Sequence, residues 1–225
     1  MKERITIAGD ELISAGIVQR TGPVVAPSDT SPHPCALHLV RQREMRVQRP
    51  SSIWLTGLSG AGKSTIAIAL KSQLREIGQL AFVLDGDELR QSINSDLGFS
   101  EVDRHENVRR IAEIAAMFNE AGVIAIVALI SPTLAGRAAA RAIIGADRFL
   151  EVHVSTELAV CEARDPKGLY QKVRAGLISN FTGISADYEI PLAPALSLDT
   201  AGASADLCAA RLVEMLLLQG ERNAT

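Results

Sequence analysis

The segment Gly57–Ser64 has residue types and a spacing suited to phosphate binding. It reads GLSGAGKS and matches the pattern G-x-x-x-x-G-K-[ST]. Glycines in such a turn let backbone N–H groups converge on phosphate oxygens, and a following helix adds the favourable end of its dipole. Lys63 would reach the β- and γ-phosphates of a nucleotide, and the Ser64 hydroxyl would bind Mg²⁺. The alternative is a glycine-rich turn that binds nothing.

Two carboxylates, Asp85 and Asp87, follow the next apolar run along the chain. If that run is a strand of a parallel sheet, both lie at the carboxyl edge, where ligands bind in open α/β folds. One carboxylate would support Mg²⁺ while the other accepts the proton of an attacking hydroxyl. We assign the base to Asp87 and the metal to Asp85, although either residue fits either role. The alternative is a turn in which Asp87 caps the next helix.

Further along the chain, two regions carry charges suited to oxyanions. Arg104, Asn107 and Arg110 are spaced at i, i+3 and i+6, so they share roughly one helix face. The planar fork of an arginine matches phosphate or sulfate oxygens. The segments 164–170 (RDPKGLY) and 180–183 (NFTG) combine glycines with basic residues, as a lid that closes over phosphates would. The alternatives are a solvated helix face and an ordinary surface segment.

Strand-like and helix-like patterns alternate from residue 51 onwards and would position these groups. The patterns predict strands at 53–56, 81–84, 123–130 and 149–154, and helices at 64–77, 103–121, 135–144, 156–163 and 203–218. This alternation predicts an α/β fold, a P-loop NTPase-type parallel sheet flanked by helices on both faces, with a small lid. We expect one P-loop domain over residues 51–220.

The first 50 residues have a different character. Residues 21–34 (TGPVVAPSDTSPHP) are rich in proline, serine and threonine and indicate a linker, and residues 5–7 alternate like a short strand. We therefore expect residues 1–50 to form an N-terminal arm and a linker outside the catalytic machinery.

Composition limits the classes of function. A chain of 225 residues with 47% hydrophobic and 22% charged residues is not wholly disordered, and a net charge of −3 argues against nucleic-acid binding. The longest apolar run, Val123–Ile130, is too short to span a bilayer, and the N-terminus does not read as a signal peptide. Cys35, Cys161 and Cys208 lack the spacing of a metal site or a disulfide framework. We expect a cytoplasmic protein with no nucleic-acid or membrane partner.

Seven motifs, in this order and spacing, resemble those of the adenylylsulfate kinase (APS kinase) family: WLTGLSGAGKST, LDGD, LGFS, DRHENVRRI, ISP, RDPKGLY and NFTGI. The resemblance covers about residues 51–218. It implies transfer of the γ-phosphoryl of Mg-ATP to the 3′-hydroxyl of adenosine 5′-phosphosulfate, giving ADP and the activated sulfate donor PAPS. With it we expect Mg²⁺, ATP as co-substrate, a homodimer and a sulfate adenylyltransferase partner.

The resemblance assigns roles to single residues on the nucleotide side. The expected ATP-binding residues are Gly57, Leu58, Ser59, Gly60, Ala61, Gly62, Lys63, Ser64, Thr65 and Arg164. The expected catalytic residues are Lys63, Asp85, Asp87 and Ser131, and the expected metal ligands are Ser64 and Asp85. Arg164 would lie against the ATP adenine. Ser131 matches a serine that is phosphorylated in some members of the family.

Another set of residues would bind the acceptor. These are Arg90, Phe99, Arg104, Asn107, Ile130, Lys167 and Phe181. By the resemblance the two phenylalanines hold the substrate adenine, Ile130 contacts it through its backbone, and Lys167 sits at the mouth of the site. The two arginines and Asn107 would bind the phosphosulfate or the ribose. As a lid residue, Phe181 is expected to be little buried before the lid closes.

The chain departs from the family pattern at two places. Glu88 replaces the asparagine of the usual Asp-Gly-Asp-Asn, and Thr133-Leu134 replaces the usual Tyr-Arg after Ser-Pro. Losing a cation and an aromatic plane near the acceptor affects the rate and the affinity more than the identity of the reaction.

Two other functions remain open. One is a gluconate- or shikimate-type P-loop kinase, which would need neither RDPKGLY nor NFTGI. The other is a nucleotide-binding domain without turnover that regulates a sulfate-activating complex, supported only by the two departures. In the arm, Glu11–Val18 and the linker resemble the junction to a GTPase-type sulfate adenylyltransferase subunit; the alternative is an unstructured extension.

Overall fold

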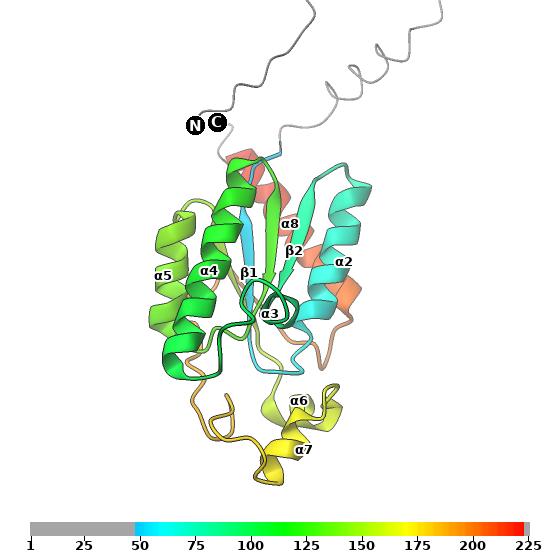
Figure 1. Cartoon of the computed structure of the whole chain (residues 1–225). Helices are drawn as coiled ribbons and strands as arrows, with labels where there is room; N and C mark the ends of the chain where they lie inside the picture. The colour runs from blue at the N-terminus through cyan, green and yellow to red at the C-terminus, as the bar shows by residue number, and fades with distance from the viewer. Residues whose placement is uncertain (1–47, 223–225) are drawn as a thin grey trace, which may run out of the picture. The chain divides into compact units, whose positions relative to one another are not determined.

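Five parallel strands form the centre of the structure, a computed structural model that describes residues 48–222. Their order is β2-β3-β1-β4-β5. The strands are β1 (Ser52–Thr56), β2 (Ala81–Asp85), β3 (Ile124–Ala128), β4 (Phe149–Val154) and β5 (Leu196–Leu198). Since every neighbouring pair is parallel, the carboxyl ends of all five meet at one edge (Figure 1). The predictions for the linker, the short strand and Cys35 lie outside the described residues, as does the arm except for residues 48–50, where the Gln48 side chain bonds Leu80 and Gly122.

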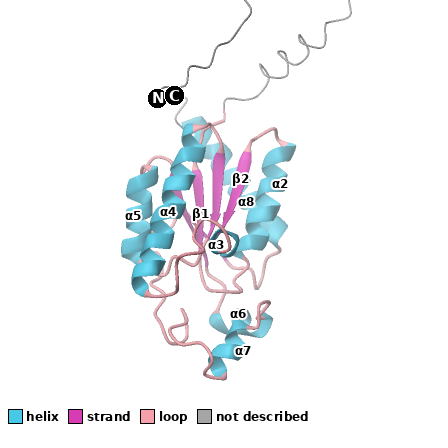
Figure 2. Cartoon of the chain, viewed as in Figure 1, coloured by secondary structure: helices cyan, strands magenta, loops and turns pink. Residues whose placement is uncertain are grey.

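Helices cover both faces of this sheet, which confirms the predicted α/β fold (Figure 2). On one face α2 (Lys63–Glu76) packs beside α8 (Ala205–Arg222), and on the other α4 (Glu101–Glu120) packs beside α5 (Leu134–Ile144). Three short helices lie around the carboxyl edge: α3 (Gly86–Arg90), α6 (Leu158–Arg164) and α7 (Leu169–Arg174). No helix within the described range is long and apolar enough to cross a membrane.

Side chains of the central strands alternate between two cores. Ile53 and Leu55 of β1 face the core beneath α2 and α8, while Trp54 between them faces the core beneath α4 and α5. All residues of β1 and β3 are buried, as expected for inner strands of a parallel sheet covered on both faces. This burial fixes the end of β1, and with it the start of the glycine-rich segment that follows.

Several boundaries differ from the predicted ones for local reasons. The helix predicted from residue 156 starts at Leu158, because the Thr156 side chain is instead bonded to the Ala61 carbonyl. Asp87 lies inside α3 and is not its cap; the Asp85 side chain accepts the Asp87 N–H. Helices α3 and α7 and strand β5 have 5, 6 and 3 residues, too few for a hydrophobic period to show in the sequence.

Phe181 is buried in this structure, so the expectation of a little-buried lid residue is wrong. It is 8% exposed and belongs to the core beneath α2 and α8. The edge of its ring meets Tyr170 of α7, with centroids 5.1 Å apart. Its carbonyl accepts the N–H groups of three residues in the tight turn 184–186. By contrast, Phe99 is 66% exposed.

We predict that Phe181→Ala lowers the free energy of unfolding by about 3–5 kcal/mol, the usual cost of emptying a buried phenylalanine site. Phe99→Ala is the matched control and should change stability little, because its ring is largely in solvent. Urea unfolding of both variants measures the difference. Equal midpoints for Phe181→Ala and wild type would contradict the packing described above.

Candidate active site

The loop between β1 and α2 requires glycine at two positions. Gly57 has φ 152°, and a Cβ there would lie 2.5 Å from the carbonyl oxygen of Val154. Gly60 has φ 74°, and its Cβ would lie 2.9 Å from the Cys161 carbonyl oxygen. At both positions φ is positive and a neighbouring carbonyl oxygen lies where a Cβ would stand. Residues with a side chain do not tolerate this combination. The loop is therefore seated tightly against β4 and α6.

Neighbouring side chains hold the outward carbonyls of this loop. The Tyr170 hydroxyl donates to the Ser59 carbonyl at 2.9 Å, and the Thr200 hydroxyl donates to the Ala61 carbonyl at 2.9 Å. Burial raises the pKa of Tyr170, so its phenol stays a donor. Within residues 48–222, the N–H groups of Gly60 and Gly62 meet no protein acceptor. They remain available to an anion at the start of α2.

Lys63 supplies a buried positive charge beside these N–H groups. Its side chain is 8% exposed, and Nζ donates to the carbonyls of Gly57 at 2.9 Å and Leu58 at 2.7 Å. Burial lowers its pKa from 10.5 to about 8, although the nearby carboxylate of Asp87 acts in the opposite direction. Among the described residues Lys63 forms no salt bridge. An anionic ligand would therefore find an ammonium without a bound counter-ion.

Ser64 and Asp85 place oxygen ligands side by side at the end of β2. The Ser64 hydroxyl donates to Asp85 Oδ2 at 2.6 Å, and Asp85 Oδ1 accepts the N–H of Asp87 at 2.9 Å. Mg²⁺ prefers such hard oxygen ligands and usually takes one or two from protein, with the rest from water and phosphate. The structured part of the chain holds no group of three or more His, Cys, Asp or Glu residues suited to a metal. The donor set therefore fits Mg²⁺ brought in with a nucleotide.

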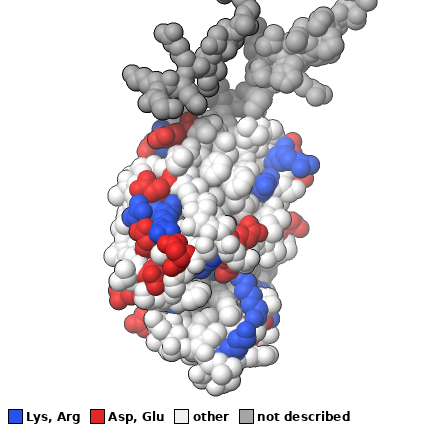
Figure 3. All heavy atoms as spheres, in the orientation of Figure 1, with Lys and Arg blue, Asp and Glu red and all other residues white. Residues whose placement is uncertain are grey.

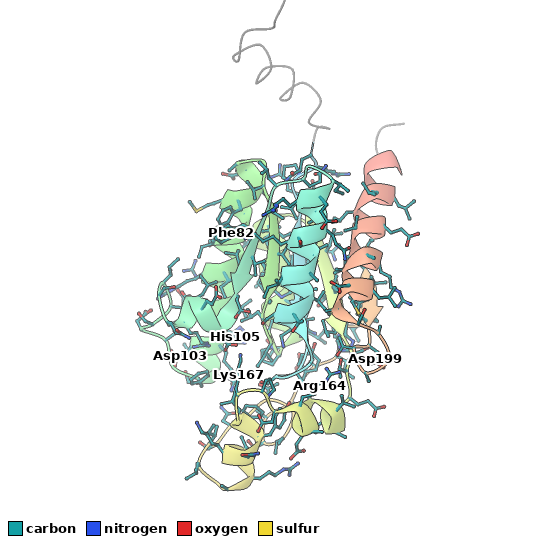
Figure 4. The ribbon with its side chains drawn as sticks, turned by 90° about the vertical axis from the view of Figure 1, so that its right-hand side faces the viewer. Phe82, Asp103, His105, Arg164, Lys167 and Asp199 are labelled. Carbon is teal, nitrogen blue, oxygen red and sulfur yellow. The ribbon has the colours of Figure 1, made fainter. Side chains whose placement is uncertain are left out.

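Asp87 meets the lid segment. Its Oδ2 contacts Nζ of Lys167 from the loop between α6 and α7, and both side chains are about half exposed. Figure 4 shows Lys167 and Arg164 on the side of α6 and α7 that faces the sheet. Arg164 donates to the hydroxyl and carbonyl of Thr200, the residue that also holds the Ala61 carbonyl. Arg164 thus lies on the glycine-loop side of the edge and Lys167 on the Asp87 side.

Arg104 connects the segments that carry the two phenylalanines. Its Nε donates to the Phe99 carbonyl at 3.0 Å, Nη1 to the Thr182 hydroxyl at 2.8 Å and Nη2 to the Asn180 carbonyl at 2.7 Å. The Arg90 guanidinium lies 4.6 Å from the centroid of the exposed Phe99 ring. Burial lowers the pKa of Arg90 and of Arg104, and for Arg90 the charge of Arg104 adds to it. An anion between them would relieve this repulsion.

Asn107 is 2% exposed and is oriented by a residue that sequence reasoning missed. The amide of the fully buried Asn94 donates from Nδ2 to Asn107 Oδ1 at 3.0 Å. The Asn107 amide nitrogen has no protein acceptor between residues 48 and 222. Asn94 lies in the turn after α3, and no spacing in the sequence relates it to Asn107.

Arg110 does not join the oxyanion face predicted for it. Its guanidinium pairs with Asp96 at 2.7 Å and Glu106 at 2.8 Å. Figure 3 shows a mixed patch of acidic and basic side chains over α4, in agreement with these ion pairs. Of the three residues predicted to form that face, Arg110 is engaged in ion pairs, and Arg104 and Asn107 stay predicted oxyanion ligands.

Ser131 is buried, and its hydroxyl accepts the Trp54 indole N–H at 3.0 Å. A buried indole N–H needs a hydrogen-bond acceptor. Because the Ser131 hydroxyl is that acceptor, it points into the core. With 2% of the residue exposed, a phosphoryl donor does not reach it in this structure, which argues against a catalytic or phosphorylated Ser131. Next to it, the Ile130 carbonyl accepts from the Thr56 hydroxyl at 2.7 Å.

The unusual pair Thr133 and Leu134 begins a helix. The Thr133 hydroxyl accepts the Gly136 N–H at 3.1 Å as the N-cap of α5, and the Leu134 N–H donates to the Glu189 carboxylate. Both residues thus satisfy the start of α5. Glu88, the other departure, is exposed on α3.

Comparison with known proteins gives a matching family and several similar proteins. A family model described as adenylylsulphate kinase matches residues 49–199. The adenylyl-sulfate kinase of Bacteroides fragilis is 54% identical over 187 residues, which cover 82% of this chain and 93% of that protein. The structure of the Mycobacterium tuberculosis APS kinase CysC in complex with AMPPNP and APS is 46% identical, with a TM-score of 0.72 over 75% of this chain and 98% of that one.

A fourth match extends further along the chain. The bifunctional enzyme NodQ of Azospirillum brasilense is 44% identical over 208 residues, which cover 92% of this chain and 33% of NodQ. The family model covers well over half of the chain, and the Bacteroides relative matches it over most of its length. The chain therefore belongs to the adenylylsulphate kinase family.

Proposed function

We propose that this protein transfers the γ-phosphoryl of Mg-ATP to the 3′-hydroxyl of adenylylsulfate, giving PAPS and ADP. The observation that carries the proposal is the meeting, at one sheet edge, of the glycine loop 57–64, the Asp85–Asp87 pair and the Arg104–Asn107 face. The Bacteroides relative carries the name of this activity, and the Mycobacterium structure holds AMPPNP and APS. Both support the proposal.

On the nucleotide side, the loop N–H groups and Lys63 would bind the β- and γ-phosphates. Ser64 and Asp85 would hold Mg²⁺, which supplies charge neutralisation on the phosphates when bound. Arg164 would lie against the adenine, next to the Thr200 hydroxyl that supports the loop.

On the acceptor side, Asp87 would take the proton of the 3′-hydroxyl as the hydroxyl oxygen forms a bond to the γ-phosphorus. The bond from that phosphorus to the bridging oxygen of ADP breaks in line. Lys167, now paired with Asp87, would turn to the transferring phosphoryl or the acceptor. Arg104 has two N–H donors beyond its three protein contacts, and the Asn107 amide nitrogen adds another for the phosphosulfate or ribose.

The acceptor adenine would be recognised by aromatic contact and by the Ile130 backbone. The Arg90 guanidinium already lies over the ring of Phe99, and this exposed ring offers aromatic surface to a base. Phe181 is engaged with Tyr170, so its contact with the adenine requires the turn 181–186 to shift as the lid closes.

Several finer points stay predictions of the proposal: use of Mg²⁺, a homodimer, a cytoplasmic location and a sulfate adenylyltransferase partner. The match to NodQ supports a second, associated activity, since this chain corresponds to one third of a bifunctional enzyme. We also keep the proposal that residues 1–50 form an arm outside a kinase domain spanning 51–220.

A comparison of three phosphoryl acceptors tests the proposed reaction. We predict that the purified full-length chain phosphorylates adenylylsulfate with Mg-ATP and leaves gluconate and shikimate unreacted. The reason is that Arg104, Asn107 and Phe99 serve a nucleotide-bearing anion and lie outside the glycine loop. Coupled detection of ADP with each acceptor is the measurement. Turnover of gluconate or shikimate at a similar rate would overturn the proposal.

The same assay separates a kinase from a regulatory domain. Lys63→Ala should lose at least about 3 kcal/mol of transition-state stabilisation, in line with single electrostatic contacts in other enzymes. Lys71→Ala is the matched control, because Lys71 lies on the same helix over the Phe82 ring, away from the loop. ATP binding without turnover of adenylylsulfate by the wild type would favour the regulatory domain.

A pair of isosteric variants tests the proton acceptor. Asp87→Asn should lower kcat strongly and leave the KM of ATP nearly unchanged, because the amide keeps the shape and does not accept the proton. Asp85→Asn should instead raise the Mg²⁺ concentration needed for half-maximal rate, since Asp85 contacts Ser64. Asp147→Asn serves as an exposed control. If Asp85→Asn loses kcat and Asp87→Asn does not, the two roles are exchanged.

A further inference from the structure

Arg137 of α5 is a buried arginine that joins three segments of the chain. Its side chain is 2% exposed. Nε donates to Glu151 Oε1 of β4 at 2.6 Å, Nη1 donates to the Ser131 carbonyl at 2.7 Å, and Nη2 donates to the Glu189 carbonyl at 2.6 Å. A buried charge is costly without partners, and here a carboxylate and two carbonyls provide them.

The partners of Arg137 lie next to the acceptor side of the site. Ser131 has φ 39°, an unfavourable value for a residue with a side chain, so this peptide needs surrounding contacts to keep its conformation. The neighbouring Ile130 carbonyl accepts from the Thr56 hydroxyl, which also bonds the Tyr188 hydroxyl at 2.9 Å. The Arg137 guanidinium lies 5.7 Å from the centre of the Tyr188 ring.

These contacts form a continuous network from the loop after β3 to the segment after the lid turn. The Glu189 N–H donates to the Pro132 carbonyl at 2.8 Å, and the Glu189 carboxylate accepts the Leu134 N–H. Residues 130–134 and 188–189 are therefore held side by side, with the guanidinium bonded to both. Phe181 and the turn 181–186 lie shortly before residues 188–189 in the chain. The fixed position of residues 188–189 therefore limits where this lid turn can lie.

We propose that Arg137 is a positioning residue for the acceptor: through the carbonyls of Ser131 and Glu189 it holds the Ser131–Pro132 peptide, next to Ile130, and the segment 188–189 after the lid turn in one arrangement. This inference rests on the proposed function, because it assigns the Ile130 side of the edge to adenylylsulfate. Arg137 does not contact the nucleotide side, where Tyr170, Thr156 and Thr200 hold the glycine loop. Its loss should therefore affect the acceptor and spare ATP.

The decisive variant is Arg137→Lys in the full chain, with Arg141→Lys as matched control. A lysine keeps the charge opposite Glu151 and cannot reach all three acceptors, whereas Arg141 lies one turn along the same helix and is exposed. We expect Arg137→Lys to raise the KM of adenylylsulfate by roughly tenfold or more, as misplacement of a binding group does. The KM of ATP should stay within about twofold of wild type, and Arg141→Lys should match wild type in both constants.

A second readout does not depend on activity. Hydrogen exchange of the Glu189 N–H, which is bonded to the Pro132 carbonyl, should become faster in Arg137→Lys and stay unchanged in Arg141→Lys. If the wild type does not phosphorylate adenylylsulfate and the exchange result holds, the proposed function fails while the anchoring role stands. If the wild type is active, equal rises of both KM values, or unchanged exchange at Glu189, overturn the inference.

A second variant tests the inference if the first one does not fold. Should Arg137→Lys be unfolded, the double variant Arg137→Gln with Glu151→Gln removes both charges of the buried pair and tests the same network. It should show the same acceptor-specific rise in KM. Unfolding of this variant too would overturn the positioning role, because Arg137 would then serve stability alone.

Discussion

The buried ammonium of Lys63 is the interaction on which the site depends. Taking this charge out of water costs free energy, and the carbonyls of Gly57 and Leu58 offset only part of that cost. The protein holds it there by packing: β1 is buried on both faces, Gly57 and Gly60 sit tightly against neighbouring carbonyls, and outside hydroxyls fix the loop. A phosphate that enters the loop would supply the missing counter-charge. Phosphate binding at Lys63 therefore depends on the packing that holds this side chain out of water.

The acceptor side is organised by arginines with a different task. Arg104 joins the segments of Phe99 and Phe181, and Arg137 joins the loop after β3 to the segment after the lid. A guanidinium suits this work because its donors diverge in a fixed plane and reach several carbonyls at once. In the proposed function, Arg104 from α4 and Arg137 from α5 position the residues that bind the acceptor. Arg137 itself bonds no residue of the glycine loop, although Thr56, which directly precedes Gly57, bonds the Ile130 carbonyl.

Local sequence patterns predicted the strands, the long helices and the glycine loop, since hydrophobic periods and the spacing of Gly, Lys and Ser are visible over a short window. They did not predict α7 and β5, which are too short to show a period, and indicated α3 only as the alternative of a helix capped by Asp87. Nor did they predict that Ser131 faces Trp54, that Phe181 packs on Tyr170, or that Asn94 orients Asn107. Each of these depends on residues that are distant in the chain and meet only through tertiary packing. Arg137 was missed for the same reason, as it lies in an ordinary alanine-rich helix.

Proton uptake on ATP binding tests the state of Lys63 most directly. In the free protein burial holds the pKa of Lys63 at about 8 against an ordinary 10.5, so near pH 8 half of the molecules carry a neutral amine. Phosphate anions favour the charged form and raise that pKa, so Lys63 should take up about half a proton near pH 8 and almost none near pH 6, seen as the difference in uptake between wild type and Lys63→Arg. Isothermal titration of the non-hydrolysable analogue AMPPNP in two buffers of different ionisation enthalpy measures this uptake, with Lys63→Arg as a control that does not titrate. Uptake near pH 8 that disappears in Lys63→Arg is the predicted result. Equal proton uptake by wild type and Lys63→Arg at pH 8 would contradict a desolvated lysine whose pKa is raised by the bound phosphate.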